Sequence, residues 1–195
     1  MGRLILVRHG ESTANRDRCF TITDDVPLTE LGRQQARETA LLIAKRFEPA
    51  RVISSTFARA RQTAEIIAAE LGLETEVVAD LHERNFGSLK GQPYEAFTEL
   101  VLRDPSYDAA KDWLWRPDGG ESQEDVRSRV VAVIEQVRAR YLEQDIVVVS
   151  HGAVMRCVWA HLQGSWKDAY LPPNGGIVAI EHYRDAFRAP RIIED

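Results

Sequence analysis

The sequence has few cysteines and lacks long apolar runs, and these two shortages exclude whole classes of protein. Only two cysteines occur in 195 residues, Cys19 and Cys157, and their separation fits no metal-binding cysteine motif. We expect two reduced thiols in a cytoplasmic protein rather than a disulfide framework. No apolar stretch approaches the length of a membrane-spanning helix, and the apolar residues near Met1 are too few for a signal peptide. We therefore expect no membrane partner.

An excess of positive charge is also missing. The formal net charge is −5, from 25 Lys and Arg against 30 Asp and Glu. Nucleic acids and anionic membranes favour basic surfaces, so neither is an expected partner. Most of the basic residues are arginines, however, which leaves room for a local pocket that binds an anion.

Several catalytic motifs are absent as well. The sequence has no H-E-x-x-H or H-x-H spacing for a metal, no G-x-S-x-G nucleophile motif and no G-x-x-x-x-G-K phosphate loop. Neither cysteine is followed six positions later by an arginine, as a cysteine-based phosphate loop would require. We therefore expect no metal and no cofactor.

Short apolar runs alternate with helical patterns along the chain. Leu4–Val7 and Ile146–Val149 are typical of strands that are buried on both faces. Further strands are expected at 51–54, 75–78, 177–180 and 188–193, and helices at 29–47, 59–71, 94–102, 122–141 and 153–162. This alternation predicts an α/β fold, a three-layer sandwich in which a mixed, mainly parallel sheet has helices on both faces.

Local capping signals mark helix ends, and nothing in the chain marks a domain boundary. Thr29 is the predicted N-cap of the first long helix, Gly72 is a predicted C-cap, and Ser122 with Asp125 forms the pattern of a capping box. Residues 1–195 are predicted to form a single domain. The stretch around 92–120 is rich in Asp, Pro, Trp and Gly, so we expect a small loop or cap insertion there.

The first apolar run ends in Arg8, His9 and Gly10. In open α/β sheets, ligands bind beyond the carboxyl ends of the strands, which is where these residues are expected. An arginine offers a planar fork of donors that fits phosphate oxygens, and a histidine can be a nucleophile, acid or base near neutral pH. Gly10 would let the chain turn tightly where a side chain would block a ligand. The alternative is a strand-end turn with a surface arginine.

The second apolar run ends in the same way, in Ser150, His151 and Gly152. His9 and His151 are 142 residues apart, so only the fold can bring them together. We predict that the two histidines meet at one edge of the sheet and bind a phosphate group. His82 is a further candidate to line this site.

Two other charged residues are candidates for the same site. Arg59 lies in the first turn of a predicted helix, where a cation opposes the helix dipole unless an anion is near. Glu83 lies close to Phe86, and a carboxyl held against an aromatic ring can stay protonated and donate a proton to a leaving group. The alternative for Glu83, which is favoured when the residue is taken in isolation, is an exposed glutamate paired with Arg84.

Six motifs together resemble those of the histidine phosphatase superfamily, also called the phosphoglycerate mutase-like family. They follow the family's order and extend over nearly the whole chain. The motifs are L-V-R-H-G-E-S-x-x-N at 6–15, P-L-T-x-x-G-x-x-Q-A at 27–36, S-x-x-x-R-A-x-Q-T-A at 55–64, L-x-E-x-x-F-G-x-x-x-G at 81–91, G-G-E-S at 119–122 and V-S-H-G at 149–152.

This resemblance implies a phosphohistidine mechanism that needs no metal. His9 would attack the phosphoryl group and carry it covalently, so activity would fall at low pH as His9 becomes protonated. Glu83 would protonate the leaving alcohol and then help water to attack the phosphohistidine. The residues implied to bind the phosphate are Arg8, Asn15, Arg59, His151 and Gly152.

Within the family, the phosphatase branch fits better than the mutase branch. The segment from Glu83 to Glu121 is short, and few residues follow the last expected strand. Gly91-Gln92-Pro93 stands where mutases tend to carry Gly-x-Asn-Lys. The resemblance therefore favours a phosphatase, in which water resolves the phosphohistidine.

The predicted function is hydrolysis of the phosphate ester of a small metabolite. Arg16, Thr21 and His82 are the candidate residues for substrate specificity. Two alternatives stay open, a bisphosphoglycerate-primed phosphoglycerate mutase and a non-catalytic module that binds a phosphorylated ligand. The oligomeric state, including a homodimer, is also left open.

Overall fold

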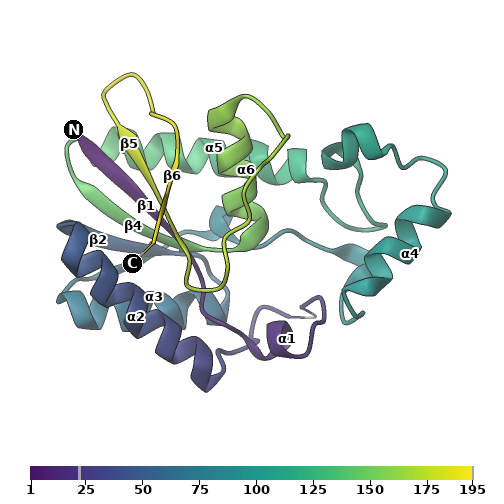
Figure 1. The fold of residues 1–195 in the computed structure, drawn as a ribbon, viewed down its shortest axis with the longest axis horizontal. Coiled ribbons are helices and arrows are strands. Elements are labelled where there is room, and N and C mark those ends of the chain that lie inside the picture. Colours follow the sequence, from purple (N-terminus) through teal and green to yellow (C-terminus); the bar gives the residue numbers. More distant parts are fainter. Residues whose placement is uncertain (22, 195) are drawn as a thin grey trace.

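A six-stranded sheet forms the centre of the computed structural model, which describes residues 1–21 and 23–194. The strand order is β3-β2-β4-β1-β5-β6, and Figure 1 shows β1 beside β4 and β5. The strands are β1 (Gly2–Arg8), β2 (Pro49–Ser54), β3 (Thr75–Val77), β4 (Asp145–Ser150), β5 (Ile177–His182) and β6 (Arg191–Ile193). The first four strands, β1 to β4, are parallel to their neighbours in the sheet, whereas β5 pairs antiparallel with β1 and β6 pairs antiparallel with β5. The predicted mixed, mainly parallel sheet is confirmed.

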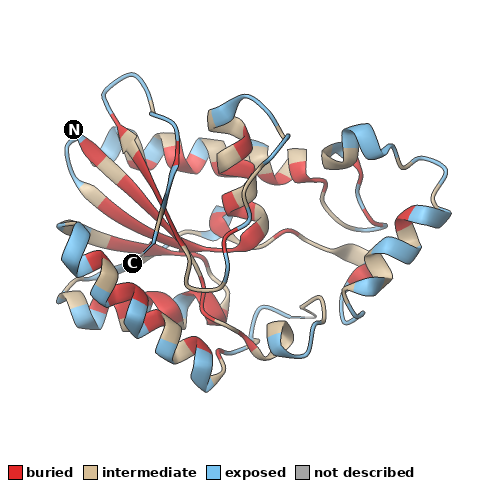
Figure 2. Cartoon of the chain, in the orientation of Figure 1, coloured by how far each residue is buried: buried red, intermediate tan, exposed pale blue. Residues whose placement is uncertain are grey.

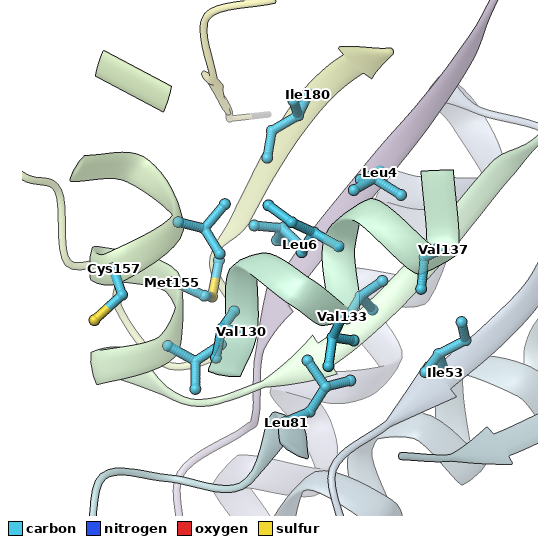
Figure 3. Close-up of a cluster of buried hydrophobic side chains, with 14 of the residues drawn as sticks. Leu4, Leu6, Ile53, Leu81, Val130, Val133, Val137, Met155, Cys157 and Ile180 are labelled. Carbon is cyan, nitrogen blue, oxygen red and sulfur yellow. The ribbon is translucent and has the colours of Figure 1, made fainter. Parts of the chain in front are cut away.

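The side chains of β1 alternate between two helical layers. Leu4 and Leu6 join a cluster with residues of α5 (Gln123–Arg140) and α6 (Gly152–Gln163), part of which is drawn in Figure 3. Ile5 and Val7 point to the other face and pack with α2 (Glu30–Arg46) and α3 (Ala58–Leu71). Successive residues of a strand face opposite sides, so an unbroken apolar run is what a doubly covered strand requires. The predicted three-layer sandwich is confirmed, and its buried strands are red in Figure 2.

The capping residues occupy the places that the sequence indicated. Thr29 caps α2, and its side chain accepts from the Gly32 N–H. Gly72 ends α3 in the left-handed conformation, and Ser122 with Asp125 forms a capping box at the start of α5. The last strand is shorter than expected, because pairing with β5 covers only 191–193.

The segment after β3 forms a small cap beyond the end of the sheet. It holds short 3-10 turns at Ala79–Leu81, Gly87–Leu89 and Ala109–Leu114, together with α4 (Glu95–Arg103). Figure 1 shows α4 at the opposite end of the molecule from both termini. Leu89, Val101 and Trp115 form its own small core. No helix of the described residues is both long and apolar enough to cross a membrane.

Candidate active site

The two histidines of the repeated strand-end motif lie side by side. β1 and β4 are parallel neighbours with Arg8 opposite Ser150, so the residues that follow both strands emerge together. The ring centroids of His9 and His151 are 5.1 Å apart, and the side chains are buried. The His9 N–H also donates to the Ser150 carbonyl oxygen at 3.0 Å. The fold thus brings together two residues that are 142 positions apart.

The hydrogen bonds of His9 define its tautomer. Nδ1 lies 2.7 Å from the Gly10 carbonyl oxygen, which can only accept, so Nδ1 carries the proton. Nε2 therefore presents its lone pair, and it accepts from Arg59 Nε at 3.0 Å. Burial, and then the charge of Arg59, keep the pKa of His9 well below its usual value of 6.5. With its pKa lowered, His9 is a neutral imidazole near pH 7, and the lone pair of its Nε2 faces a guanidinium.

Buried Arg59 and partly buried Arg8 have buried donor atoms that no described residue accepts. Arg59, the second residue of α3, leaves Nη1 without a partner. Arg8 donates from Nη1 to the Pro172 carbonyl oxygen at 2.7 Å, but its buried Nε is unpaired. A buried cation with free donors is costly unless an anion completes its bonds. The pair therefore leaves unpaired cationic donors close to His9.

His151 is oriented by Ser55, the first residue of the third motif, for which the sequence indicated no role. Its Nε2 lies 2.8 Å from the Ser55 hydroxyl, which follows β2. Its Nδ1 is buried and has no partner among the described residues. If the hydroxyl donates to Nε2, Nδ1 carries a proton that is free to bind an anion. Burial, and then the charge of Arg59, lower the pKa of His151 well below its usual range.

Glu83 lines a cavity of about 450 Å³ together with Arg8, His9 and Arg59, whereas His151 lies behind His9 and is not among the lining residues. Glu83 Oε1 accepts from the Arg84 N–H at 2.8 Å. The Arg84 guanidinium does not pair with Glu83, because it donates to the carbonyl oxygens of Glu121 and Trp115. The alternative of a simple Glu83–Arg84 ion pair is therefore wrong. The other lining residues include Asn15, Thr21, Phe86, Tyr94, Asp112, Gln123, Gly152 and Arg156.

The loop that carries Glu83 is held by Arg129 of α5. The Arg129 guanidinium donates to the carbonyl oxygens of Asp80, His82 and Glu83, at 2.7, 2.9 and 3.3 Å. It also donates to both carboxylate oxygens of Glu121, whose Oε2 accepts from the Asn85 N–H. No pattern in the sequence points to Arg129, since a polar residue on a helix gives no signal of what it contacts.

The remaining predicted residues are less central. Asn15 lines the cavity, where its amide donates to the Tyr94 hydroxyl while its Oδ1 caps α1 (Thr13–Arg16). Thr21 also lines it. Arg16 and His82 are not among the lining residues: Arg16 is ion-paired with Asp17 at the surface, and the His82 ring stacks on Phe57.

Of two glycines in the motifs, Gly10 is required for close packing against backbone, whereas a Cβ at Gly152 would approach within 3 Å only the end of the flexible Leu171 side chain. A Cβ on Gly10 would lie 2.2 Å from the carbonyl oxygen of Gly32, which belongs to the second motif. The neighbouring backbone therefore excludes a side chain at Gly10. The expectation that a side chain at this position would block a ligand is replaced by this steric reason. A Cβ on Gly152 would lie 2.7 Å from Leu171 and 3.5 Å from the Arg8 guanidinium carbon.

Within residues 1–21 and 23–194, no group of three or more His, Cys, Asp or Glu is placed to hold a metal ion.

The model of the histidine phosphatase superfamily (branch 1) matches residues 4–194 of the chain. The chain belongs to this superfamily. The family that the six motifs indicated is confirmed, and this histidine phosphatase is an enzyme of that type.

Relatives of this histidine phosphatase include both phosphatases and a mutase-like protein. Phosphoglycerate mutase-like protein 4 of Arabidopsis thaliana is 34% identical over 166 residues, which cover 83% of this chain and 71% of the relative. The metal-independent phosphoserine phosphatase of A. thaliana is 32% identical over 185 residues, covering 93% and 76%. A mycobacterial glucosyl-3-phosphoglycerate phosphatase, solved with VO3, superposes with a TM-score of 0.83 at 27% identity, covering 97% of this chain and 96% of that one.

Proposed function

We propose that this protein hydrolyses phosphomonoesters of small metabolites by way of a phosphohistidine on Nε2 of His9. The observation that carries the proposal is the state of that nitrogen. Its lone pair is fixed by the bond from Nδ1 to Gly10, and it faces the guanidinium of Arg59 in a cavity. A neutral, oriented imidazole beside unpaired cationic donors is what nucleophilic attack on a phosphoryl group requires.

In the first step, the phosphate takes up the free donors of Arg8, Arg59 and His151. Arg59 then gives up its bond to His9, which frees Nε2 for in-line attack on phosphorus. A bond forms from Nε2 to phosphorus as the bond from phosphorus to the alcohol oxygen breaks. The guanidinium groups stabilise the charge on the equatorial oxygens, and Glu83 gives its proton to the leaving alcohol.

In the second step, Glu83 acts as a base. The carboxylate takes a proton from a water molecule, whose oxygen attacks phosphorus as the bond to Nε2 breaks. Inorganic phosphate leaves, and Glu83 is again protonated for the next cycle. We propose a cytoplasmic enzyme in which residues 1–195 act as a single domain.

The test is to trap the intermediate with a ³²P-labelled ester in a rapid-quench experiment. The wild-type protein should show a label on histidine that is stable in base and lost in acid, and His9→Ala should show neither label nor turnover. His161→Ala, on α6 but outside the cavity lining, is the matched control and should keep both. Turnover by a folded His9→Ala variant would overturn the proposal.

A mutase-like relative at 34% identity makes phosphoglycerate mutase activity the second candidate. A mutase returns the phosphoryl group from His9 to the second hydroxyl of the substrate, whereas a phosphatase passes it to water. Enzyme primed with bisphosphoglycerate should therefore release free phosphate from phosphoglycerate without interconverting its isomers. Isomer exchange without phosphate release would favour the mutase.

A further inference from the structure

Helix α6 leads from the proposed phosphate site into the outer part of the cavity. Gly152 begins this helix, close to the Arg8 guanidinium. Arg156 follows four residues later, so it lies on the same face, about 6 Å further along the axis. Both residues line the cavity. Arg156 is thus placed one helical turn beyond the phosphate, where the alcohol part of an ester would lie.

The guanidinium of Arg156 donates no hydrogen bond to any described residue and makes only a long ion pair. Its ion pair among the described residues is with Asp112 of the cap, at 3.7 Å, which is longer than a charge-assisted hydrogen bond. Its side chain is 29% exposed. Arg84 also lines the cavity, but its donors are used on two backbone carbonyls. Arg156 is therefore a cation in the outer cavity that can bind an anionic group without breaking a hydrogen bond.

Gln123 adds a buried acceptor to the same part of the site. It is the first residue of α5, it lines the cavity, and it is only 6% exposed. Its Oε1 is buried and accepts no hydrogen bond within the described chain. A buried acceptor without a donor is unfavourable, so a hydroxyl or ammonium group of a ligand would stabilise it. The Asp112 carboxylate is a second acceptor in the cavity wall.

Aromatic rings line the rest of the cavity wall in this outer part. Phe20, Phe86 and Phe97 line it, and the rings of Phe20 and Phe86 are 4.6 Å apart. This wall suits a short carbon skeleton, whereas Arg156, Gln123 and Asp112 suit polar groups attached to it. A cavity of about 450 Å³ holds such a molecule together with the phosphate.

We propose that Arg156, Gln123 and Asp112 form a second subsite, which selects phosphate esters whose alcohol part carries a carboxylate beside a hydroxyl or ammonium group. The carboxylate binds Arg156, and the neighbouring donor binds Gln123 Oε1 and Asp112. This inference rests on the proposed function, because the phosphate on His9 sets the direction in which the alcohol part points.

Matched esters that differ at one group test the subsite. In the first pair, 3-phosphoglycerate carries a carboxylate where glycerol 3-phosphate carries a CH2OH group. In the second pair, phosphoserine carries a carboxylate where phosphoethanolamine carries a hydrogen atom. The wild-type enzyme should have a kcat/KM about 10- to 100-fold higher for the carboxylated member of each pair. Arg156→Met should remove this preference by raising KM for the carboxylated esters, with kcat and the uncarboxylated esters little changed. Arg156→Lys should restore part of it.

Arg127→Met is the matched control, since Arg127 is ion-paired with Glu124 and is not a lining residue. It should leave both preferences unchanged. Equal kcat/KM for the two members of each pair in the wild type, or an equal loss for both in Arg156→Met, would overturn the subsite.

Failure of the proposed function would look different. Hydrolysis through a labelled His9 with no carboxylate preference overturns only the subsite, whereas the absence of any labelled His9 overturns the function. If no labelled His9 is found, the dissociation constants of the same four esters are measured for the wild-type protein and for Arg156→Met. A carboxylate preference that depends on Arg156 would still support the subsite, and equal binding would reject it.

Discussion

Replacing Arg129 by Met removes the side chain that ties α5 to the loop of Glu83. The variant loses hydrogen bonds to three backbone carbonyls and to both oxygens of Glu121. The Arg129 and Glu121 side chains are only 15% and 21% exposed, so Glu121 is left as a nearly buried carboxylate. Burial opposes ionisation of Glu121, but the bonds from Arg129 and Asn85 hold its pKa below the usual value, and without Arg129 that pKa should rise.

The expected losses follow from this geometry. Removing one member of a buried ion pair costs about 3–5 kcal/mol. Because Glu121 keeps the Asn85 N–H and some contact with water, we expect the free energy of unfolding to fall by about 3 kcal/mol. A 1 Å displacement of Glu83 should reduce kcat about 100-fold. KM should change little, because the arginines that would bind phosphate are not touched.

The assay combines urea unfolding with the kinetics of two esters. p-Nitrophenolate leaves without a proton, whereas an alkyl alcohol needs the proton of Glu83, so kcat should fall further for the alkyl ester. Arg138→Met is the control, because Arg138 lies on the same helix, is 16% exposed, and also bonds a carboxylate and backbone carbonyls away from the cavity. It should lower stability without lowering kcat. An equal loss for both esters in Arg129→Met would refute a role in positioning Glu83.

Three further predictions concern the pH range, the glycines and the thiols. Burial and the charge of Arg59 depress the pKa of His9, so its ring should stay neutral well below pH 6.5 in an NMR titration. The free energy of unfolding should therefore decline as the pH falls from about 6.5 toward the pKa of the folded state. A titration midpoint of His9 near pH 6.5 would contradict this. Gly10→Ala should lower Tm far more than Gly72→Ala, and equal losses would refute the close packing. Gly72→Ala meets no neighbouring atom and costs about 1–2 kcal/mol, because the positive φ at this position is unfavourable for a residue with a Cβ. Native protein should react with a thiol reagent once, at Cys19, because Cys157 is buried with its pKa raised to about 12; two fast-reacting thiols would disagree.

Local signals in the sequence predicted the sheet, the helix caps and the meeting of the two histidines. Each of these depends on a short pattern, either an apolar run, a capping residue or a strand end at a parallel edge. Arg129 and Gln123 could not be found in this way, because what they contact depends on where distant elements pack. For the same reason, Ser55 was recognised only as a motif residue and not as the partner of His151. Arg16 was expected near the substrate because it lies in a loop after the first motif, yet its side chain turns to Asp17.

The position of β1 between β4 and β5 has a consequence for how the protein is made. His9 is synthesised before both neighbours of its strand, since β4 and β5 follow β1 by more than 130 residues. At about 5–20 residues per second, roughly 7–28 s separate the synthesis of His9 from that of His151. During that interval the apolar face of β1 has no partner strand and is exposed to chaperones and to aggregation. A ribosome-bound chain that stops before β4 should therefore be unable to form the phosphohistidine, and activity would report completion of the fold.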